Sequence, residues 1–165
     1  MAMTLEGQVA IVTGAGRGFG RAVAVSLAAE GAAVAVASRT RTQLDETVRH
    51  IETGGGRGFA IAGDVTQRRD VAFIVAAAEK HFGPVTLLVN NAGVPDPFGP
   101  VSDIDPDQWW AAQAVHVYGP LLFMRAVLPG MKQRRAGRII NVSAYGGTVV
   151  APCLSAYCVG KAAQN

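Results

Sequence analysis

Residues 9–20 read Val-Ala-Ile-Val-Thr-Gly-Ala-Gly-Arg-Gly-Phe-Gly, and this stretch decides the fold. The first five residues are apolar or small, which predicts a buried β-strand over 9–13. Gly14, Gly18 and Gly20 follow, and a helical pattern over 21–30 ends at Gly31, the expected C-cap. Glycine lets a backbone approach a pyrophosphate closely, and a helix N-terminus directs N–H groups at it. The stretch therefore predicts a strand, a loop and a helix that bind a dinucleotide.

Strand and helix patterns continue to alternate along the chain. Apolar runs predict further strands over 34–38, 58–62, 85–89 and 138–142. Helices are expected over 43–53, 70–82 and about 105–135, the last kinked or divided at Gly119-Pro120, and another begins near Ser155. This alternation predicts an α/β, Rossmann-like, doubly wound parallel sheet of strand order 3-2-1-4-5. We expect residues 1–165 to form a single NAD(P)-binding domain.

The composition excludes several classes of protein. Half of the 165 residues are hydrophobic and 16% are charged, which is a globular profile rather than a disordered one. The net charge is only +3 and the arginines are mostly scattered, so no nucleic-acid partner is expected. Because no apolar run approaches the ~20 residues that span a bilayer, no membrane segment is expected either. Cys153 and Cys158 lack metal-ligand spacing, which predicts reduced thiols in a cytoplasmic protein.

Two further motifs follow the fourth and fifth predicted strands. Asn90-Asn91-Ala92-Gly93 comes directly after the fourth strand, and Tyr157 precedes Lys161 by four residues on the last helix, so both point from one helix face. Together with Thr13 to Gly20, these motifs have the order and spacing of the short-chain dehydrogenase/reductase family, which the chain resembles over essentially its whole length. The resemblance implies hydride transfer between a nicotinamide cofactor and the carbonyl or secondary alcohol of a small molecule.

The end of the second strand indicates which nicotinamide cofactor is bound. An acidic residue there binds the ribose 2′-OH of NAD, whereas an arginine accommodates the 2′-phosphate of NADP. This chain has Ser38-Arg39-Thr40 at that position and Arg17 in the glycine loop. Because guanidinium and hydroxyl groups suit a phosphate, we expect NADP(H) rather than NAD(H). An exposed surface charge is the alternative for either arginine.

The resemblance also implies the remaining cofactor contacts. Asp64 and the backbone N–H of Val65 would contact adenine, with a turn or helix cap as the alternative for Asp64. Residues 91–93 would line the nicotinamide ribose, and we expect Asn90 to tie the fourth strand to the Thr13 loop. The predicted cofactor-binding residues are Gly14, Arg17, Gly18, Phe19, Gly20, Ser38, Arg39, Asp64, Val65, Asn91, Ala92, Gly93, Tyr157 and Lys161.

The catalytic residues that the resemblance implies are incomplete here. Tyr157 matches the acid that protonates the carbonyl oxygen, and Lys161 matches the cation that assists it. The family serine falls at Ala144, and the neighbouring Ser143 is a candidate catalytic residue, with a structural role as its alternative. His116 stands where the family has an asparagine that positions a water linked to the lysine. A partial relay and a packed imidazole without a catalytic role are both open for His116.

Relatives in this family continue past the Tyr/Lys helix with two further strands. We therefore expect a C-terminally incomplete domain that lacks them, either a fragment or a degenerate product, whose fifth strand is an apolar edge. The alternative function is a catalytically impaired domain that binds NADP or a partner. Relatives form homodimers and homotetramers through the helices after strands 4 and 5. The apolar residues available for such an interface, or for ordinary core, are Trp109, Trp110, Leu121, Leu122, Phe123 and Met124.

Overall fold

Among residues 4–165, which the computed structural model describes, five strands form one parallel sheet. They are β1 (Val9–Thr13), β2 (Ala33–Ser38), β3 (Arg57–Ala62), β4 (Leu87–Asn90) and β5 (Arg138–Asn141). Their order, β3-β2-β1-β4-β5, confirms the predicted topology. In the central register Ala10 pairs with Val34 on one side and with Leu87 on the other. Because every pairing is parallel, the carboxyl ends of all the strands meet at one edge of the sheet.

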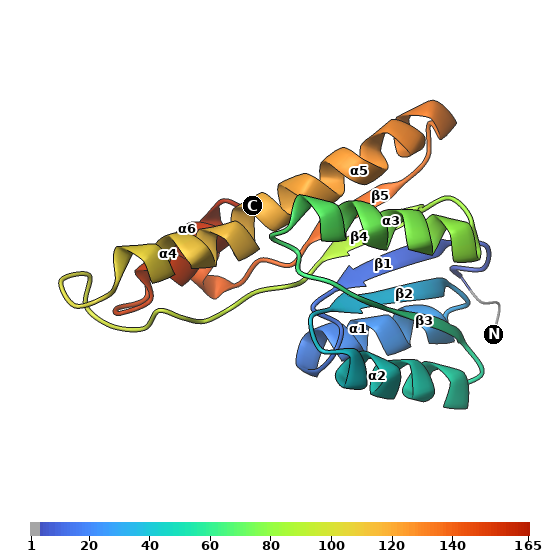
Figure 1. Ribbon diagram of the computed structural model, residues 1–165, viewed down its shortest axis with the longest axis horizontal. Helices are drawn as coiled ribbons and strands as arrows, with labels where there is room; N and C mark the ends of the chain where they lie inside the picture. Colours follow the sequence, from blue (N-terminus) through green and yellow to red (C-terminus); the bar gives the residue numbers. More distant parts are fainter. Residues whose placement is uncertain (1–3) are drawn as a thin grey trace.

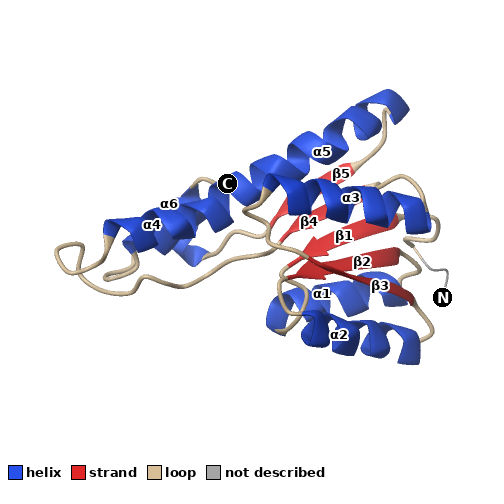
Figure 2. Ribbon diagram, in the orientation of Figure 1, coloured by secondary structure: helices blue, strands red, loops and turns tan. Residues whose placement is uncertain are grey.

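The helices cover both faces of this sheet. Figure 2 shows α1 and α2 on one face and α3 and α5 on the other. Their ends differ from the predicted ones by a few residues. The elements are α1 (Gly18–Ala29), α2 (Arg41–Thr53), α3 (Arg68–Phe82), α4 (Pro106–Gln113), the π-helical turn η1 (Ala114–Tyr118), α5 (Gly119–Arg134), the 3₁₀ turn η2 (Tyr145–Gly147) and α6 (Ser155–Ala162). None of the helices within residues 4–165 is long and apolar enough to cross a membrane.

The core has two parts, one on each face of the sheet. Ile11 packs with Ile74 and Phe123 on the α3/α5 face. Its neighbour Val12 packs with Leu44 and other residues on the α1/α2 face. Successive strand residues point to opposite faces, so a strand covered on both sides needs apolar residues throughout. This requirement explains the uninterrupted apolar run of β1.

The long helical stretch after β4 is divided, as predicted, but through a π-helical turn. The Asp105 carboxylate accepts a hydrogen bond from Asp107 N at 2.8 Å and caps α4, with Pro106 in its first turn. The turn η1 then precedes Gly119 and Pro120, whose ring nitrogen has no hydrogen to donate to the helix. Such single π-turns are frequent at functional sites. Here the turn carries His116, which is completely buried.

Helices α4 and α6 extend beyond the carboxyl ends of the strands, side by side (Figure 1). Trp109 Nε1 donates to Ser155 Oγ at 3.2 Å, and Gln113 Nε2 donates to the Ala156 carbonyl at 2.9 Å. These bonds fix the short helix α6, which carries Tyr157 and Lys161.

The apolar residues considered for an interface divide between core and surface. Leu122 and Phe123 are buried, which assigns them to the core, whereas Trp110 and Leu121 are exposed. Strand β5 is an edge of the sheet, as expected, and Ile140 on it is 42% exposed. An assembly through these surfaces stays a prediction.

Candidate active site

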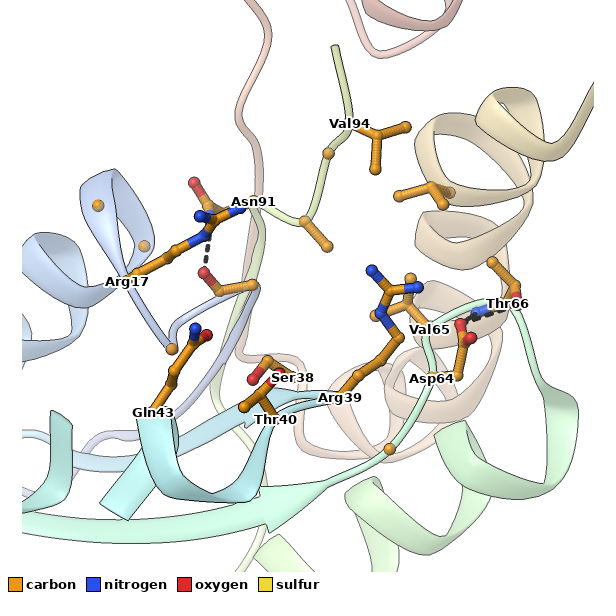
Figure 3. Close-up of a pocket in the computed structure, with 18 of the residues that line it drawn as sticks. Arg17, Ser38, Arg39, Thr40, Gln43, Asp64, Val65, Thr66, Asn91 and Val94 are labelled. Carbon is orange, nitrogen blue, oxygen red and sulfur yellow. Dashed lines mark hydrogen bonds between the residues drawn. The ribbon is translucent and has the colours of Figure 1, made fainter. Parts of the chain in front are cut away.

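An open pocket of about 700 Å³ lies at the carboxyl ends of the strands. Such a position and volume are typical of a ligand site in a doubly wound sheet. Figure 3 shows side chains from the glycine loop, from the ends of β2 and β3 and from the segment after β4 around it. Every cofactor-binding residue predicted before the last helix lines this pocket: Gly14, Arg17, Gly18, Phe19, Gly20, Ser38, Arg39, Asp64, Val65, Asn91, Ala92 and Gly93. The structure thus brings these residues together, while what they bind stays a prediction.

Thr13 and Asn91 join the glycine loop to the segment after β4. The Thr13 hydroxyl accepts hydrogen bonds from the backbone N–H groups of Asn91 and Ala92, each at 3.0 Å. Asn91 Nδ2 donates in return to the Thr13 carbonyl at 2.8 Å. The prediction that Asn90 makes this link is therefore wrong, because Asn90 Nδ2 donates to Asn141 Oδ1 on β5 at 2.9 Å. Asn91 has a structural role in addition to its place in the pocket wall.

Glycines are required where the glycine loop after β1 meets the segment after β4. Gly14 has a φ of +66°, and a Cβ there would lie 2.8 Å from the Ala92 Cα. A Cβ on Gly20 would lie 2.4 Å from both the Gly14 carbonyl oxygen and Asn91 Nδ2. Side chains larger than hydrogen are excluded at such distances. The loop can therefore pass between β4 and α1 only with this spacing of glycines.

Side chains of α1 and α2 hold the loop from the other side. Arg21 donates to the Gly16 carbonyl at 2.6 Å and to Glu46 Oε2 at 2.7 Å. Thr47 Oγ1 donates to the Ala15 carbonyl at 2.9 Å. The hydrogen bond and charge of Arg21 lower the pKa of Glu46 below its ordinary value. The carbonyls of the loop are thus bound on its α2 side.

The pocket end near β2 is suited to an anion. Among the described residues, no side chain caps the N-terminus of α1 or of α2, so their first N–H groups are not bound by the cap residues Arg17 and Thr40. Ser38 Oγ is buried and has no hydrogen-bond partner within residues 4–165. Arg17 and Arg39 are both exposed and line the same pocket, with their guanidinium groups on different sides of it (Figure 3). A buried hydroxyl without a partner, in a pocket that two arginines also line, fits a bound oxyanion.

Asp64 closes a turn, which is the alternative that the sequence left open. Its Oδ1 accepts from Thr66 N at 2.9 Å and from Thr66 Oγ1 at 2.8 Å, as Figure 3 shows. The second carboxylate oxygen takes no part in these two bonds. A contact of Asp64 and Val65 with adenine therefore stays a prediction.

Sequence reasoning missed one wall of the pocket and two residues beside the anion end. Gln43 and Thr66 follow predicted residues closely, so proximity to strand ends could have indicated them. The opposite wall consists of Val94, Ala111, Ala114 and Val115. It comes from the β4–α4 segment, α4 and η1, and these apolar residues carry no motif that could have been recognised in the sequence.

Tyr157 and Lys161 lie beside the pocket rather than in its lining. Lys161 Nζ donates to the Val142 carbonyl at 2.7 Å and to Gln164 Oε1 at 2.9 Å, and lies 5.8 Å from the centre of the Tyr157 ring. Burial lowers the pKa of the Lys161 ammonium. Gly93 connects Lys161 with the pocket, because it lines the pocket and a Cβ on it would lie 3.6 Å from Lys161 Nζ.

Ser143 has a structural contact. Its hydroxyl donates to the backbone carbonyl of Lys161 at 2.9 Å, which ties the end of β5 to α6. This geometry favours the structural role that was the alternative in the sequence. A catalytic role for Ser143 stays a prediction that its hydrogen bond does not support.

Comparisons with known proteins agree over almost the whole chain. The profile of the short chain dehydrogenase family matches residues 8–165. A short chain dehydrogenase of Pseudocercospora fijiensis is 40% identical over 161 residues, which are 96% of this chain and 52% of that protein. The crystal structure of an NAD⁺-bound xylitol dehydrogenase has a TM-score of 0.93 and 32% identity, and covers 97% of this chain and 62% of its own. A metagenomic short-chain oxidoreductase in complex with NADP has a TM-score of 0.92 and 36% identity, with coverages of 98% and 73%. The chain therefore spans between about half and three quarters of the length of these proteins.

Proposed function

Because the chain belongs to the short-chain dehydrogenase family, we propose that it forms the cofactor-binding part of an NADP(H)-dependent oxidoreductase. The reaction would interconvert a carbonyl and a secondary alcohol of a small molecule. The observation that carries the proposal is the position of Tyr157 and Lys161. Helix α6 carries both, with Lys161 Nζ 5.8 Å from the centre of the Tyr157 ring and 3.6 Å from a Cβ placed on Gly93, which lines a pocket large enough for a nucleotide.

The residues at the anion end support NADP(H) as the cofactor. Arg17, Arg39 and the Ser38 hydroxyl, which has no hydrogen-bond partner among the residues that the structure describes, would hold a 2′-phosphate. Similarity alone leaves the choice open, since one of the two solved structures is described with NAD⁺ and the other with NADP. The chemistry of these three side chains therefore carries this part of the proposal.

Tyr157 acts as the general acid of the proposed reduction. Its phenol donates a proton to the carbonyl oxygen, and in the reverse direction the phenolate accepts the proton of the alcohol. A bound nicotinamide supplies or accepts the hydride. Within the described chain, Lys161 Nζ uses two N–H groups on Val142 and Gln164, which leaves the third for a cofactor hydroxyl.

Replacing Arg39 with aspartate is expected to raise the Kd for NADP⁺ by about 10- to 100-fold, since a charge-assisted hydrogen bond contributes roughly 1.5–3 kcal/mol. The Kd for NAD⁺ should change far less, because no 2′-phosphate is involved. Isothermal titration calorimetry with both nucleotides measures the ratio. Arg49→Asp, an equal change of charge at an exposed position on α2 outside the pocket, is the control. An unchanged NADP⁺/NAD⁺ affinity ratio in Arg39→Asp would contradict the assignment.

A catalytically impaired NADP-binding domain is the second candidate function. The observation that favours it is Ala144, which replaces the family serine, while the hydroxyl of the adjacent Ser143 is bonded to the α6 backbone. Tight NADP(H) binding without turnover of any carbonyl substrate would support this candidate.

Replacing Ala144 with serine is expected to raise kcat, because loss of one donor to a developing oxyanion typically costs about 10²–10³ in rate. NADPH oxidation with a panel of ketones and aldehydes measures the change. Ser143→Ala is expected to leave kcat near its original value, and a matching loss would instead identify Ser143 as the catalytic serine. Absence of turnover in both the parent chain and Ala144→Ser would favour the binding domain.

Assembly and location also stay proposals. Trp110, Val117 and Leu121 on α4, η1 and α5 are exposed and would be buried in a homodimer or homotetramer. Cys153 and Cys158 are free thiols, which fits a reducing compartment such as the cytoplasm.

A further inference from the structure

Gln164 carries an amide that is buried directly beside the Lys161 ammonium. Gln164 is 7% exposed and Lys161 is 5% exposed. The backbone N–H of Gln164 donates to the Lys161 carbonyl at 3.2 Å, in the turn that follows α6. Residues three positions apart lie on the same side of such a turn, so the two side chains can meet. Lysine is almost never buried unless it is paired, and glutamine is mostly exposed in folded proteins.

The amide of Gln164 joins Lys161 to the turn η1. Its Oε1 accepts a hydrogen bond from Lys161 Nζ at 2.9 Å, and its Nε2 donates to the backbone carbonyl of His116 at 2.9 Å. These two partners define the orientation of the amide, because an ammonium can only donate and a carbonyl can only accept. Both ends of the buried amide are therefore bonded.

The His116 carbonyl is available for this bond because of the residue four positions later. In an α-helix the carbonyl would accept from the N–H of residue 120. That residue is Pro120, whose nitrogen has no hydrogen. Helix α6 also approaches η1 closely, since a Cβ on Gly160 would lie only 2.6 Å from His116 Cβ. A proline on one element and a glycine on the other thus allow the amide to reach this carbonyl.

The side chain of His116 is separate from this bridge. Its Nε2 lies 3.4 Å from the backbone nitrogen and 2.8 Å from the carbonyl oxygen of Val94. Its ring meets the Tyr157 ring edge-on, with centres 5.6 Å apart. A relay through the imidazole stays a prediction, whereas the backbone of residue 116 has a bonded partner on the segment that follows α6.

Within the described residues, only neutral groups accept hydrogen bonds from the Lys161 ammonium. They are the Val142 carbonyl, at 2.7 Å, and Gln164 Oε1, and neither ion pair of this part of the chain includes Lys161. The titratable groups that face the ammonium are Tyr157 on its own helix and His116 on η1. Burial lowers the pKa of Lys161, whereas hydrogen bonds to the ammonium favour its charged form. Of the two acceptors, only Gln164 contributes a side chain.

We propose that Gln164 is a positioning residue for Lys161, whose amide holds the ammonium against η1 in its charged form and leaves its third N–H for the pocket that Gly93 lines. The proposal rests on the function proposed above, which assigns that N–H to a cofactor hydroxyl. Gln164 acts through Lys161 and does not touch the reacting atoms. It belongs to none of the motifs that the sequence contains.

The pKa of Lys161 in the full chain, measured without a cofactor, tests the proposal. The chain has three lysines, of which Lys80 and Lys132 are exposed, so nuclear magnetic resonance of ¹³C-lysine-labelled protein follows each titration separately. Lys161→Arg assigns the signal. We expect the pKa of Lys161 to fall in Gln164→Leu, which removes an acceptor, and to rise in Gln164→Glu, which places a carboxylate beside the ammonium.

Gln133→Leu is the control, because it makes the same change at an exposed position of α5 and should leave the pKa of Lys161 unchanged. Circular dichroism melts establish which variants fold, and Gln164→Glu decides alone if Gln164→Leu does not. An unchanged pKa of Lys161 in a folded Gln164→Leu, or a pKa in Gln164→Glu that is not above that of the parent chain, overturns the proposal.

Kinetics with NADPH gives a second readout that a packing role would not move. We expect Gln164→Leu to lower kcat by up to about 10²-fold, because small misplacements of catalytic groups cost this much. Gln164→Glu still accepts from Lys161 and should keep more of kcat. Since the ammonium is charged only below its pKa, the alkaline fall of kcat/KM should move to lower pH in Gln164→Leu and to higher pH in Gln164→Glu.

The outcomes separate this proposal from the function on which it rests. A parent chain that does not turn over contradicts the proposed reductase, and the lysine titration then decides the role of Gln164 alone. A parent chain that turns over, with kcat and the pH profile unchanged in Gln164→Leu, overturns the positioning role and leaves the reductase intact.

Discussion

Tyr157→Phe is expected to lower kcat for NADPH-dependent carbonyl reduction by roughly 10²–10⁴-fold, the usual contribution of a general acid. The substitution removes only the phenolic oxygen. The edge-on contact of the ring with His116 and the bonds of Lys161 to Val142 and Gln164 do not use that oxygen. The Kd for NADPH and the melting temperature should therefore stay close to those of the parent chain. Steady-state NADPH oxidation gives kcat, and nucleotide fluorescence titration gives the Kd.

Tyr118→Phe is the matched control for this substitution. Tyr118 lies on η1, and its hydroxyl accepts a hydrogen bond from Arg68 away from α6. Tyr118→Phe removes the same atom as Tyr157→Phe. Because this hydroxyl lies away from α6, we expect kcat of Tyr118→Phe to stay near that of the parent chain. Equal rates for Tyr157→Phe and the parent chain would contradict the assignment of the acid. A rise in Kd as large as the fall in kcat would instead show that the phenol serves binding.

The arrangement of strands could be predicted because it depends on patterns local to the sequence. An apolar run such as 9–13 identifies a strand buried on both faces, and strictly alternating helices force parallel pairing. The glycine positions were equally informative, since Gly14 and Gly20 have no room for a side chain. These features bring the loops after β1, β2, β3 and β4 to the same pocket.

Other features of the site depend on contacts between distant segments. Asn90 and Asn91 are the same residue type in adjacent positions, and the pairing of β4 with β1 on one side and with β5 on the other determines which of them meets Thr13. The orientation of Ser143, which follows β5, likewise depends on the packing of α6, because its hydroxyl donates to the Lys161 carbonyl on that helix. The Gly119-Pro120 pair indicated a break, but not a π-helical turn that directs His116 inward.

Gly20→Ala is expected to disrupt the loop that all the proposed chemistry requires. The added Cβ would lie 2.4 Å from the Gly14 carbonyl oxygen and from Asn91 Nδ2. Asn91 cannot move away cheaply, because it is bonded to the Thr13 carbonyl at 2.8 Å through the same nitrogen. Overpacking of this kind typically costs about 1–3 kcal/mol of unfolding free energy. We expect a Tm lower by several degrees and, since the loop must shift, a Kd for NADPH at least about 10-fold higher.

Gly54→Ala shows whether the effect is specific to the loop. Gly54 follows α2 with a φ of −80°, and a Cβ there would make only ordinary contacts, at 3.4 Å from the Ile51 carbonyl oxygen. Alanine restricts the unfolded chain at both positions in the same way, so any difference between the two variants arises in the folded state. A thermal melt and a fluorescence titration of each variant give that difference. Parent-like values for Gly20→Ala in both measurements would mean that the loop does not pass between β4 and α1 as closely as these distances require, and the pocket could not then have its present form.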